Sequence, residues 1–525
     1  MNLAIKRAII SVSDKTFLLD LAKGLREFGV EIISTGGTYQ KLISADIPAK
    51  EISQITEFPE MLDGRVKTLH PRIFAGILAR KDHPQHLQTL KDHQLLEIDL
   101  VVCNLYPFAE TLKKPNASEE MIIENIDIGG PSMLRAAAKN FESISVLSSP
   151  DQYSKFLEEF HRLKGFISLE TRKNLAYAVF QFTACYDAMI ANYFLKENQE
   201  NTLFPIILPK NLIQQNILRY GENPHQQAAL YSETVGVPGT LTGAEILHGK
   251  ELSYNNYLDL NSALQLVREF SSPGAVIVKH NNPCGVGIGE NASLAFQRAF
   301  QGDPVSAFGG IIALNREVDE VVANEIAQPN RFFECIIAPS FSDAGFEILT
   351  TKPSWKKNVR LLRMGQLEPT VKESLEFRQI DGGWLVQTTN SQEPDPALWQ
   401  LVTNGTGPNE EQLAQLSFAW KVCKHVKSNA IVVAKESRIL GVGAGQMSRV
   451  DSMQIALQKA GVEAQEAFLA SDAFFPFPDN VELAAKAGIR FIVQPGGSMR
   501  DQESIDACNR HGISMLFTKM RHFRH

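Results

Sequence analysis

In the N-terminal part of this sequence, short apolar runs alternate with segments of helical periodicity, and this alternation restricts the possible folds more than any other feature. The runs 8–12, 30–34, 98–104 and 143–147 have the length and composition of buried strands, and apolar residues in 14–28 recur at helical spacing. Strands that alternate with helices predict a parallel sheet covered by helices. Residues that directly follow such strands meet at one edge of the sheet, where open α/β folds bind ligands.

The length of the chain, 525 residues, requires more than one hydrophobic core. A long helical stretch, 168–195, is followed by segment 196–211, which is polar and then interrupted by prolines. We therefore place a domain boundary after residue 197, which predicts domains 1–197 and 198–525.

The second domain contains a faint internal repeat. The apolar strand 275–279 is followed by a GxGxG sequence at 285–289, and the apolar strand 430–434 is followed by another at 441–445. We interpret both glycine sequences as tight loops at strand ends, because their spacing differs from the GxGxxG of dinucleotide-binding loops. Two copies of one α/β unit explain the repeat. They predict two related subdomains, approximately 198–390 and 391–525.

Composition and charge argue against several classes of function. The net charge of -7 disfavours a general nucleic-acid binder, which normally carries a basic surface. No apolar run approaches the roughly 18 residues of a membrane span, and residues 1–13 fit a first strand better than a signal peptide. The six cysteines are scattered, which is typical of reduced thiols. We expect a cytoplasmic protein with no nucleic-acid or membrane partner.

The dipeptide Pro283-Cys284 is half of a zinc deaminase signature, but the rest of that signature is absent. No histidine is followed two residues later by a glutamate, and the second cysteine of a PCxxC pair is missing. We therefore expect no zinc and no other metal site.

Two loops of the first domain are candidates for a phosphate site. Residues 11–16 and 34–38 carry hydroxyl groups, and each loop lies where a predicted strand ends. The free N–H groups of a helix N-terminus favour an anion. The alternative is that Ser13 or Asp14 only caps its helix.

A second group of polar residues follows other strands of the first domain. Residues 65–71 combine three basic or titratable side chains, and Tyr106 stands directly after a buried strand. Asp127 is a carboxylate in an apolar segment beside a glycine turn, and Arg135 and Lys139 share one face of the next helix. Each is more often structural when taken alone, but together they form the pattern of a site.

In the second domain the strongest candidate is the pair Lys279-His280, which follows a fully apolar strand. Histidine titrates near neutral pH and burial lowers the pKa of a lysine, so the pair suits proton transfer. The alternative is a histidine that only completes local hydrogen bonds. Residues 219–226 form a second polar and aromatic loop.

Taken in chain order, these motifs resemble the two halves of the bifunctional purine biosynthesis proteins. The resemblance to the cyclohydrolase half rests on residues 11–15, 65–71, 104–108, 126–130 and 135–140. The resemblance to the formyltransferase half rests on residues 219–226, 279–285, 303–310, 441–446, 471–477 and 521–523. It implies an α/β fold: an N-terminal parallel sheet similar to methylglyoxal synthase (flavodoxin-like), and a C-terminal half with two cytidine-deaminase-like subdomains that lack zinc.

The resemblance also implies the last two steps of IMP synthesis. A formyl group passes from 10-formyltetrahydrofolate to an aminoimidazole carboxamide ribotide (AICAR), and the product (FAICAR) loses water as its ring closes to IMP. The formyl-folate is then a co-substrate, no metal is required, and a monovalent cation can support the transferase, as in the family. The family further implies a homodimer. The alternatives are a regulatory ligand-binding protein and a methylglyoxal-synthase-like lyase, which needs only the first domain.

The resemblance assigns roles to individual residues. It implies catalytic roles for Lys279, His280 and Asn429 in formyl transfer, and for Lys67, Tyr106, Asp127 and Lys139 in ring closure. It implies substrate binding by Ser13, Lys15, Ser34, Gly37, Thr38, Arg65, Thr68, Asn104, Arg219, Tyr220, Asn282, Gly309 and Arg521. It implies folate binding by Phe308, Arg449, Phe474 and Asp479.

Overall fold

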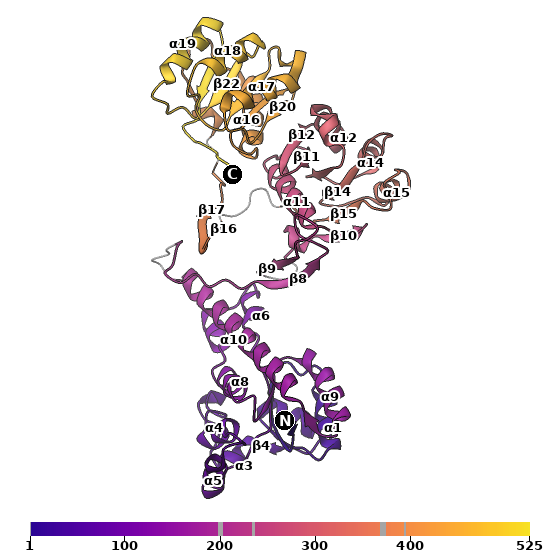
Figure 1. Cartoon of the computed structure of the whole chain (residues 1–525), viewed down its shortest axis with the longest axis vertical. Helices are drawn as coiled ribbons and strands as arrows, with labels where there is room; N and C mark the ends of the chain where they lie inside the picture. Colours follow the sequence, from indigo (N-terminus) through magenta and orange to yellow (C-terminus); the bar gives the residue numbers. More distant parts are fainter. Residues whose placement is uncertain (1, 198–202, 234–236, 368–373, 393–394) are drawn as a thin grey trace. The chain divides into compact units, whose positions relative to one another are not determined.

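The computed structural model describes residues 2–197, 203–233, 237–367, 374–392 and 395–525. The chain forms two compact units, Met1–Asn211 and Leu212–His525 (Figure 1). The segment before Leu212 belongs to the first unit because it bonds to the long helix α10 (Leu169–Glu197): Asn211 Nδ2 donates to the carbonyl of Cys185 at 2.7 Å. The division therefore lies somewhat later in the chain than the predicted boundary at 197.

The first unit is built on a five-stranded sheet in the order β4-β3-β2-β5-β6, and every neighbouring pair is parallel. The predicted parallel sheet is confirmed. Its strands are β2 (Arg7–Val12), β3 (Glu31–Ser34), β4 (Lys50–Glu51), β5 (Leu100–Asn104) and β6 (Ser145–Leu147). A separate antiparallel pair joins β1 (Leu3–Ala4) to β7 (Phe166–Ile167).

Helices cover both faces of this sheet. Successive strand residues point to opposite faces, so Ile9 packs in one apolar layer while Ala8 and Ile10 pack in the other. The helices are α1 (Leu18–Glu27), α2 (Gly36–Ile43), α3 (Ile52–Thr56), α4 (Pro71–Leu78), α5 (Pro84–Asp92), α6 (Phe108–Leu112), α7 (Glu119–Glu124), α8 (Gly129–Lys139), α9 (Tyr153–Arg162) and α10.

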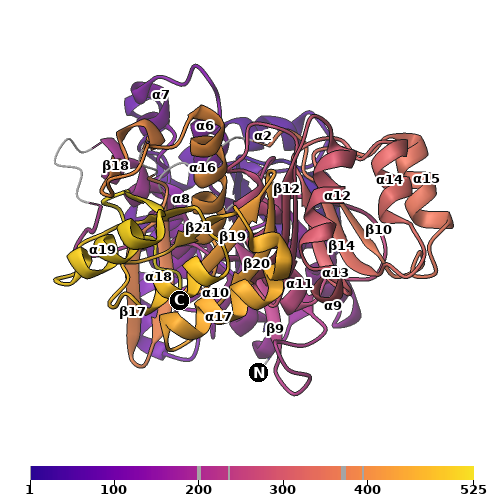
Figure 2. The same ribbon diagram turned by 90° about the horizontal axis from the view of Figure 1, so that it is seen from above.

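The second unit is built on a twelve-stranded sheet whose two halves repeat one pattern (Figure 2). Each half has a helix, an antiparallel hairpin, a second helix and then three strands that are parallel to one another. The first of these three strands pairs antiparallel with the hairpin. The first half contains β10 (Glu245–His248), α11 (Tyr254–Val267), β11 (Gly274–Lys279), β12 (Asn282–Ile288), α12 (Ala292–Gly302), α13 (Pro304–Ala307), β13 (Gly310–Leu314), α14 (Glu320–Ile326), β14 (Phe333–Ala338), α15 (Asp343–Thr351) and β15 (Arg360–Arg363).

The second half contains β18 (Gln400–Leu401), α16 (Glu410–Lys424), β19 (Ile431–Lys435), β20 (Arg438–Gly443), α17 (Arg449–Ala460), β21 (Phe468–Ser471), α18 (Asp479–Lys486), β22 (Phe491–Gln494), α19 (Asp501–His511) and β23 (Ser514–Phe517). The halves join in the sheet where Gly287 of β12 pairs with Arg438 of β20. Two further hairpins lie outside the large sheet: β8 (Ile213–Leu218) with β9 (Ala228–Ser232), and β16 (Leu375–Ile380) with β17 (Gly383–Thr388).

The two GxGxG sequences are not loops at strand ends, and that interpretation was wrong. Gly285 and Gly287 lie within β12, and Gly441 and Gly443 lie within β20. Their role is close packing, because a Cβ on Gly287 would lie 2.6 Å from the carbonyl oxygen of Ala295 in α12. Glycines at every second position give the sheet a bare face on which a helix can lie directly.

Candidate active sites in the two units

A cavity of about 200 Å³ lies in the second unit, where the two halves of the sheet meet. The hairpin β11–β12 and the start of α13 form one wall, and β20 and α17 form the other. Both residues of the predicted proton-transfer pair reach it. The cavity is lined by Lys279, His280, Asn282, Pro283, Cys284, Gly302, Asp303, Ser306, Ile439, Gly441, Val442, Ala444 and Lys459.

His280 lies in a two-residue turn. Lys279 pairs with Asn282 across the hairpin, and between them His280 and Asn281 have φ angles of 53° and 61°. Two left-handed residues in succession make a type I′ turn, for which asparagine is well suited. The turn holds His280 at the end of a rigid hairpin with an exposed side chain.

Asp259 of α11 fastens this turn, and sequence reasoning did not identify it. Its Oδ1 accepts the N–H of Asn281 at 2.6 Å. Burial raises the pKa of Asp259, while hydrogen bonds from the N–H groups of Asn281 and His280 and the charge of His280 act in the opposite direction. The signal in the sequence was slight: Asp259 is the single charged residue of α11.

The neighbours of Lys279 and Asn282 connect the hairpin to other predicted residues. Lys279 Nζ donates to the carbonyl of Phe308 at 2.7 Å, and the Phe308 ring is 54% exposed. Gly309 adopts a φ of 77° and donates its N–H to Phe332. Asn282 Oδ1 accepts the N–H of Lys427 at 3.0 Å, which links the first half to the second.

The floor of the cavity carries a charged cluster that sequence reasoning did not place in the site. Lys459 of α17 forms an ion pair with Asp303, and Ser306 Oγ donates to Asp303 Oδ2 at 2.7 Å. Burial alone would raise the pKa of Asp303, but the bonds from Lys459 and Ser306 outweigh it and lower that pKa. Burial raises the pKa of Cys284 to about 12, so this thiol stays protonated at neutral pH.

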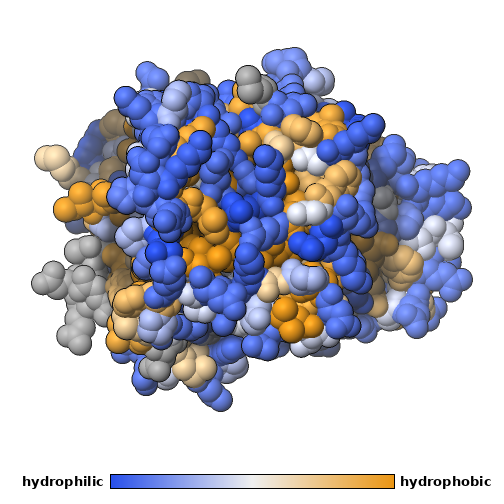
Figure 3. Space-filling model, turned by 90° about the horizontal axis from the view of Figure 1, so that it is seen from below, coloured by the Kyte–Doolittle hydropathy of each residue, from blue (hydrophilic) through white to orange (hydrophobic). Residues whose placement is uncertain are grey.

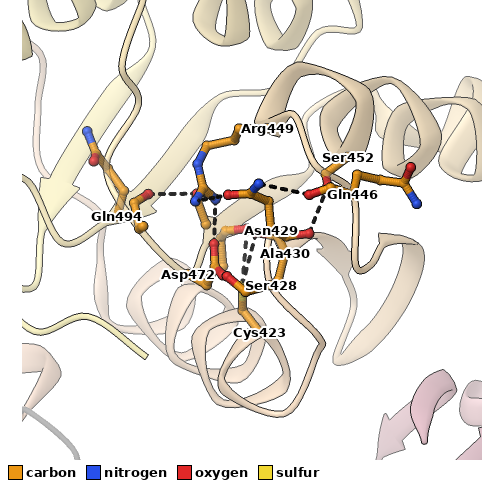
Figure 4. Close-up of polar contacts among 12 residues, drawn as sticks. Cys423, Ser428, Asn429, Ala430, Gln446, Arg449, Ser452, Asp472 and Gln494 are labelled. Carbon is orange, nitrogen blue, oxygen red and sulfur yellow. Dashed lines mark hydrogen bonds and ion pairs between the residues drawn. The ribbon is translucent and has the colours of Figure 1, made fainter. Parts of the chain in front are cut away.

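The half-buried Asn429 and the buried Arg449 belong to one polar cluster (Figure 4). Arg449 Nη2 donates to Asn429 Oδ1 at 2.7 Å, and Nη1 donates to Ser471 and forms an ion pair with Asp472. Asn429 Nδ2 donates to the carbonyl of Gln446 at 2.8 Å. Both side chains are thus engaged in hydrogen bonds within the protein, which suits a supporting role better than direct contact with a ligand.

The remaining predicted residues of the second unit are not among the described residues that line the cavity. The Arg219 guanidinium stacks on the Tyr220 ring, with 4.8 Å to the ring centroid, and Arg521 stacks on Phe523 at 4.3 Å. Phe474 and Asp479 are exposed near the start of α18.

In the first unit the two hydroxyl-rich loops lie side by side at the carboxyl edge of the sheet. Ser11 of β2 bonds to Thr35 at 2.7 Å between their hydroxyl oxygens, and Thr38 Oγ1 donates to the carbonyl of Val12 at 3.0 Å. Ser34 is fully buried, and its hydroxyl donates to the carbonyl of Ile10 at 2.7 Å. A Cβ on Gly37, near the start of α2, would meet nothing within 4 Å.

Asn104 shapes the first of these loops. Its Oδ1 accepts the N–H groups of Ser13 at 2.6 Å and Asp14 at 2.9 Å, and its Nδ2 donates to the carbonyl of Asp14. Lys15 Nζ donates to the carbonyl of Ser13 at 3.3 Å and remains exposed. The bonded amide of Asn104 therefore holds the loop rather than pointing freely to solvent.

Asp127 is the centre of a second cluster at the same edge. Its Oδ1 accepts the N–H of Gly130, in the first turn of α8, at 2.8 Å. Burial raises the pKa of Asp127, and the N–H groups of Gly130 and Tyr106 and the charge of Lys67 partly counteract this. The Tyr106 ring is 40% exposed beside it. The structure thus brings Lys67, Tyr106 and Asp127 together.

Two further residues lie near Asp127. Tyr186 was not identified from the sequence, and Thr68 is one of the predicted residues. Tyr186 of α10 donates its hydroxyl to the carbonyl of Asn125 at 3.0 Å and accepts the N–H of Asp127 at 2.9 Å. Thr68 is buried, and its hydroxyl would lie 2.8 Å from a Cβ on Gly129.

Lys139 and Arg65 are placed differently from the other predicted residues. Lys139 ends α8 whereas Asp127 precedes its start, and a rise of 1.5 Å per residue separates the two ends by about 15 Å. The structure therefore does not bring Lys139 to Asp127 within this unit. Arg65 is exposed and forms an ion pair with Glu124.

The described residues contain neither a metal-binding cluster nor a helix that could span a membrane. They contain no group of three or more His, Cys, Asp or Glu side chains arranged to hold a metal ion. Within the same residues no helix has the length and apolar character needed to cross a membrane.

Known proteins resemble this chain over nearly its whole length. A family model described as an MGS-like domain matches residues 17–132, and one described as the AICARFT/IMPCHase bienzyme matches residues 137–459. A protein of Oceanobacillus iheyensis described as bifunctional purine biosynthesis protein PurH is 52% identical, with 99% of this chain and 100% of the relative covered. A protein of Rhodopirellula baltica with the same description is 50% identical, with 99% of each covered. A solved structure described as ForH is 36% identical over 36% of this chain and 96% of its own, with a TM-score of 0.34, which carries no argument about the fold.

Proposed function

The chain belongs to the family of bifunctional purine biosynthesis proteins, the AICARFT/IMPCHase bienzymes, and from that premise we propose how its residues divide the work. It catalyses the last two steps of IMP synthesis: formyl transfer to AICAR, with a formyl-folate as co-substrate, and dehydrative closure of FAICAR to IMP. The match over nearly the full length of both relatives does not favour a regulatory binding protein or a lyase of the first domain alone.

We place formyl transfer in the cavity of the second unit. The AICAR amine is a poor nucleophile, because its lone pair is delocalised into the ring and carboxamide. As the amine nitrogen bonds to the formyl carbon, His280 accepts the amine proton; as the bond from formyl carbon to folate nitrogen breaks, that nitrogen keeps the electron pair and takes up a proton. Lys279 stabilises the charge on the leaving side. The observation that carries this assignment is that Lys279, His280 and Asn282 line one cavity.

Other predicted residues of this unit then have binding or supporting roles. Phe308 and Gly309 follow the carbonyl that holds Lys279, which suits orientation of the formyl donor. Phe474 and Asp479 offer exposed groups for the folate, and Arg219, Tyr220 and Arg521 offer exposed groups for the ribotide. Asn429 and Arg449 support the segment at 446–447 through the polar cluster (Figure 4).

We place ring closure at the Asp127 cluster of the first unit. The carboxamide nitrogen attacks the formamide carbon, and the tetrahedral intermediate then loses water. A carboxylate with a raised pKa is a better base, so Asp127 accepts the carboxamide proton while Lys67, the Tyr106 hydroxyl and N–H groups at the start of α8 stabilise the developing oxyanion. The phosphate is held by the loops of Ser13, Lys15, Ser34, Gly37 and Thr38, the first of which Asn104 supports. Arg65 and Thr68 bind the ribotide from the side of the Asp127 cluster.

Further parts of the proposal concern assembly and surroundings. We propose a homodimer, supported by large exposed apolar side chains such as Ile206, Ile207 and Trp384 and by the apolar patches visible on one face in Figure 3. We propose a cytoplasmic location, supported by six cysteines that are all unpaired. We also propose that a monovalent cation supports the transferase, on the family resemblance alone.

A crossed pair of variants tests the division of labour in the full-length protein. His280→Ala should abolish IMP formation from AICAR and 10-formyltetrahydrofolate, yet leave closure of supplied FAICAR intact. Asp127→Asn should do the reverse: FAICAR accumulates and is not closed. Ultraviolet absorbance distinguishes the three ribotides. Loss of both activities in either variant would mean that the change unfolds the chain or that the assignment of units is wrong.

A further inference from the structure

The two halves of the second unit contain the same structural device at equivalent positions. Helices α11 and α16 both begin with a capping box, at Ser253 and at Asn409. Six residues after each N-cap, a polar side chain reaches the hairpin turn of its own half. Asp259 Oδ1 accepts the N–H of Asn281 at 2.6 Å, and Gln415 Oε1 accepts the N–H of Ser437 at 2.8 Å.

The correspondence between the devices extends to sequence spacing and backbone shape. In both halves the acceptor and the turn residue are 22 residues apart. His280 and Asn281 have φ angles of 53° and 61°, and Glu436 and Ser437 have φ angles of 52° and 59°. The second hairpin is therefore an internal reference for what such a turn requires.

That reference shows that a neutral amide is enough to hold the turn. Gln415 accepts the N–H of Ser437, and its Nε2 donates to Ser437 Oγ at 3.1 Å. The first half has a carboxylate at the same place, although burial disfavours its charged form and raises the pKa of Asp259. Since an amide can hold the turn, the carboxylate in the first half indicates a further role, which depends on the residue that each turn carries.

The two turns differ in the residue they present to the cavity. The first carries His280, which lines the cavity, whereas the second carries Glu436, which is not among the described lining residues. The charged groups that act on Asp259 from neighbouring elements are His280 of its hairpin and Glu334 of β14. Glu334 is itself held by Arg360 of β15, with 3.6 Å between Nη1 and Oε2, and by Asn256 Nδ2 at 3.0 Å.

We propose that Asp259 is a positioning residue for formyl transfer: its carboxylate fixes the turn that carries His280 and stabilises the positive charge that the imidazole gains from the amine proton. The inference rests on the proposed role of His280. The proton moves from the AICAR amine to the imidazole and later leaves to solvent or to the folate nitrogen, and Asp259 neither accepts nor releases it.

Steady-state kinetics of the full-length protein test this proposal. The variants are Asp259→Asn, which keeps one acceptor oxygen and removes the charge, Asp259→Ala, which removes both, and Gln415→Ala as the matched control in the other half. For each variant, kcat and KM of formyl transfer are measured across pH. Closure of supplied FAICAR is measured on the same sample, as a control that the rest of the chain is folded and active.

Asp259→Asn should lower kcat of formyl transfer roughly tenfold, a small part of what a general base contributes, with KM for AICAR within about twofold. Without the carboxylate an imidazolium is less stable, so the acid limb of the kcat profile should move to lower pH. Asp259→Ala should lower kcat further, because the turn loses its acceptor. Gln415→Ala should leave kcat within about twofold, and FAICAR closure should be unchanged in all three variants.

Several results would overturn the inference. An unchanged kcat and pH profile in Asp259→Asn, with His280→Ala inactive in formyl transfer, rejects the role of Asp259 alone. A similar loss in Gln415→Ala, or a parallel loss of FAICAR closure, shows that the residue only supports the fold. If His280→Ala retains formyl transfer, the proposed role of His280 fails and the inference fails with it.

Discussion

His522, close to the C-terminus, gives the sharpest prediction of how stability depends on pH. Its side chain is 1% exposed and packs against Trp420, with 5.3 Å between ring centroids. Nδ1 lies 3.0 Å from Asn390 Oδ1, and Nε2 has no hydrogen-bond partner among the described residues. Burial, reinforced by the charge of Lys424, lowers the pKa of His522 from 6.5 to about 4.

The sign and size of the effect follow from this lowered pKa. Below pH 6.5 the unfolded chain binds a proton that the folded chain does not accept until about pH 4, so stability falls as the pH drops through that window. At 1.36 kcal/mol for each pKa unit, the full loss is about 3 kcal/mol, of which about 2 kcal/mol falls between pH 7 and pH 5. His522→Gln lacks the titrating ring and should lose this share of the pH dependence.

Urea unfolding followed by tryptophan fluorescence measures the effect in the intact chain. All four tryptophans, Trp355, Trp384, Trp399 and Trp420, lie in the second unit, so the signal reports that unit alone. The free energy of unfolding of the natural chain should fall by about 2 kcal/mol more than that of His522→Gln between pH 7 and pH 5. Equal pH dependence of the two proteins would refute the reasoning.

Three other predictions concern packing, charge and domain structure. Gly287→Ala places a Cβ 2.6 Å from the carbonyl oxygen of Ala295 and should lower the free energy of unfolding of the second unit by about 1–3 kcal/mol in the fluorescence assay. In the control Gly383→Ala the new Cβ meets nothing within 4 Å, so the free energy of unfolding should change by less than about 0.5 kcal/mol. Lys424 and His425 are buried and each lies 2.9 Å from the carboxylate of Glu269, so Glu269→Gln should lower the free energy of unfolding by about 3–5 kcal/mol in the same assay. A smaller loss in the double variant Glu269→Gln with Lys424→Met would show that the unpaired buried lysine causes the effect. A fragment ending at Asn211 should close FAICAR without folate. A fragment ending at residue 197 should be less stable to heat, because it lacks the hydrogen bond from Asn211 to Cys185. A folded but inactive fragment ending at Asn211 would contradict the assignment of ring closure to this unit.

The parallel sheet of the first unit could be predicted because its central strands are buried on both faces and form continuous apolar runs. Strand β4, Lys50–Glu51, could not be, because a polar two-residue edge strand carries no such pattern. Helix α1 starts at Leu18 and not at Asp14 as its periodicity suggested. The carboxylate of Asp14 accepts the N–H and the hydroxyl of Thr16, which closes a turn before the helix begins.

The position of the two glycine sequences in the second unit could not be predicted from local sequence. Glycine is usual in turns, so GxGxG was assigned to loops, yet its period of two is also the period of a strand. Only knowledge of the helix that lies on β12 would have distinguished the two readings. The candidate site was limited in the same way: Lys279 and His280 follow an apolar strand and could be found. Lys459 reaches the cavity, and Asp259 reaches the hairpin turn, from helices that are distant in the sequence.

The cavity of the second unit depends on both halves of its repeat. The first half supplies the hairpin with Lys279 and His280, and the second half supplies Gly441 of β20 and Lys459 of α17 to the same space. The ion pair from Lys459 to Asp303 joins the two halves across the cavity. Because the hairpin with Lys279 and His280 and the opposite wall come from different halves of the repeat, neither half could form this cavity alone.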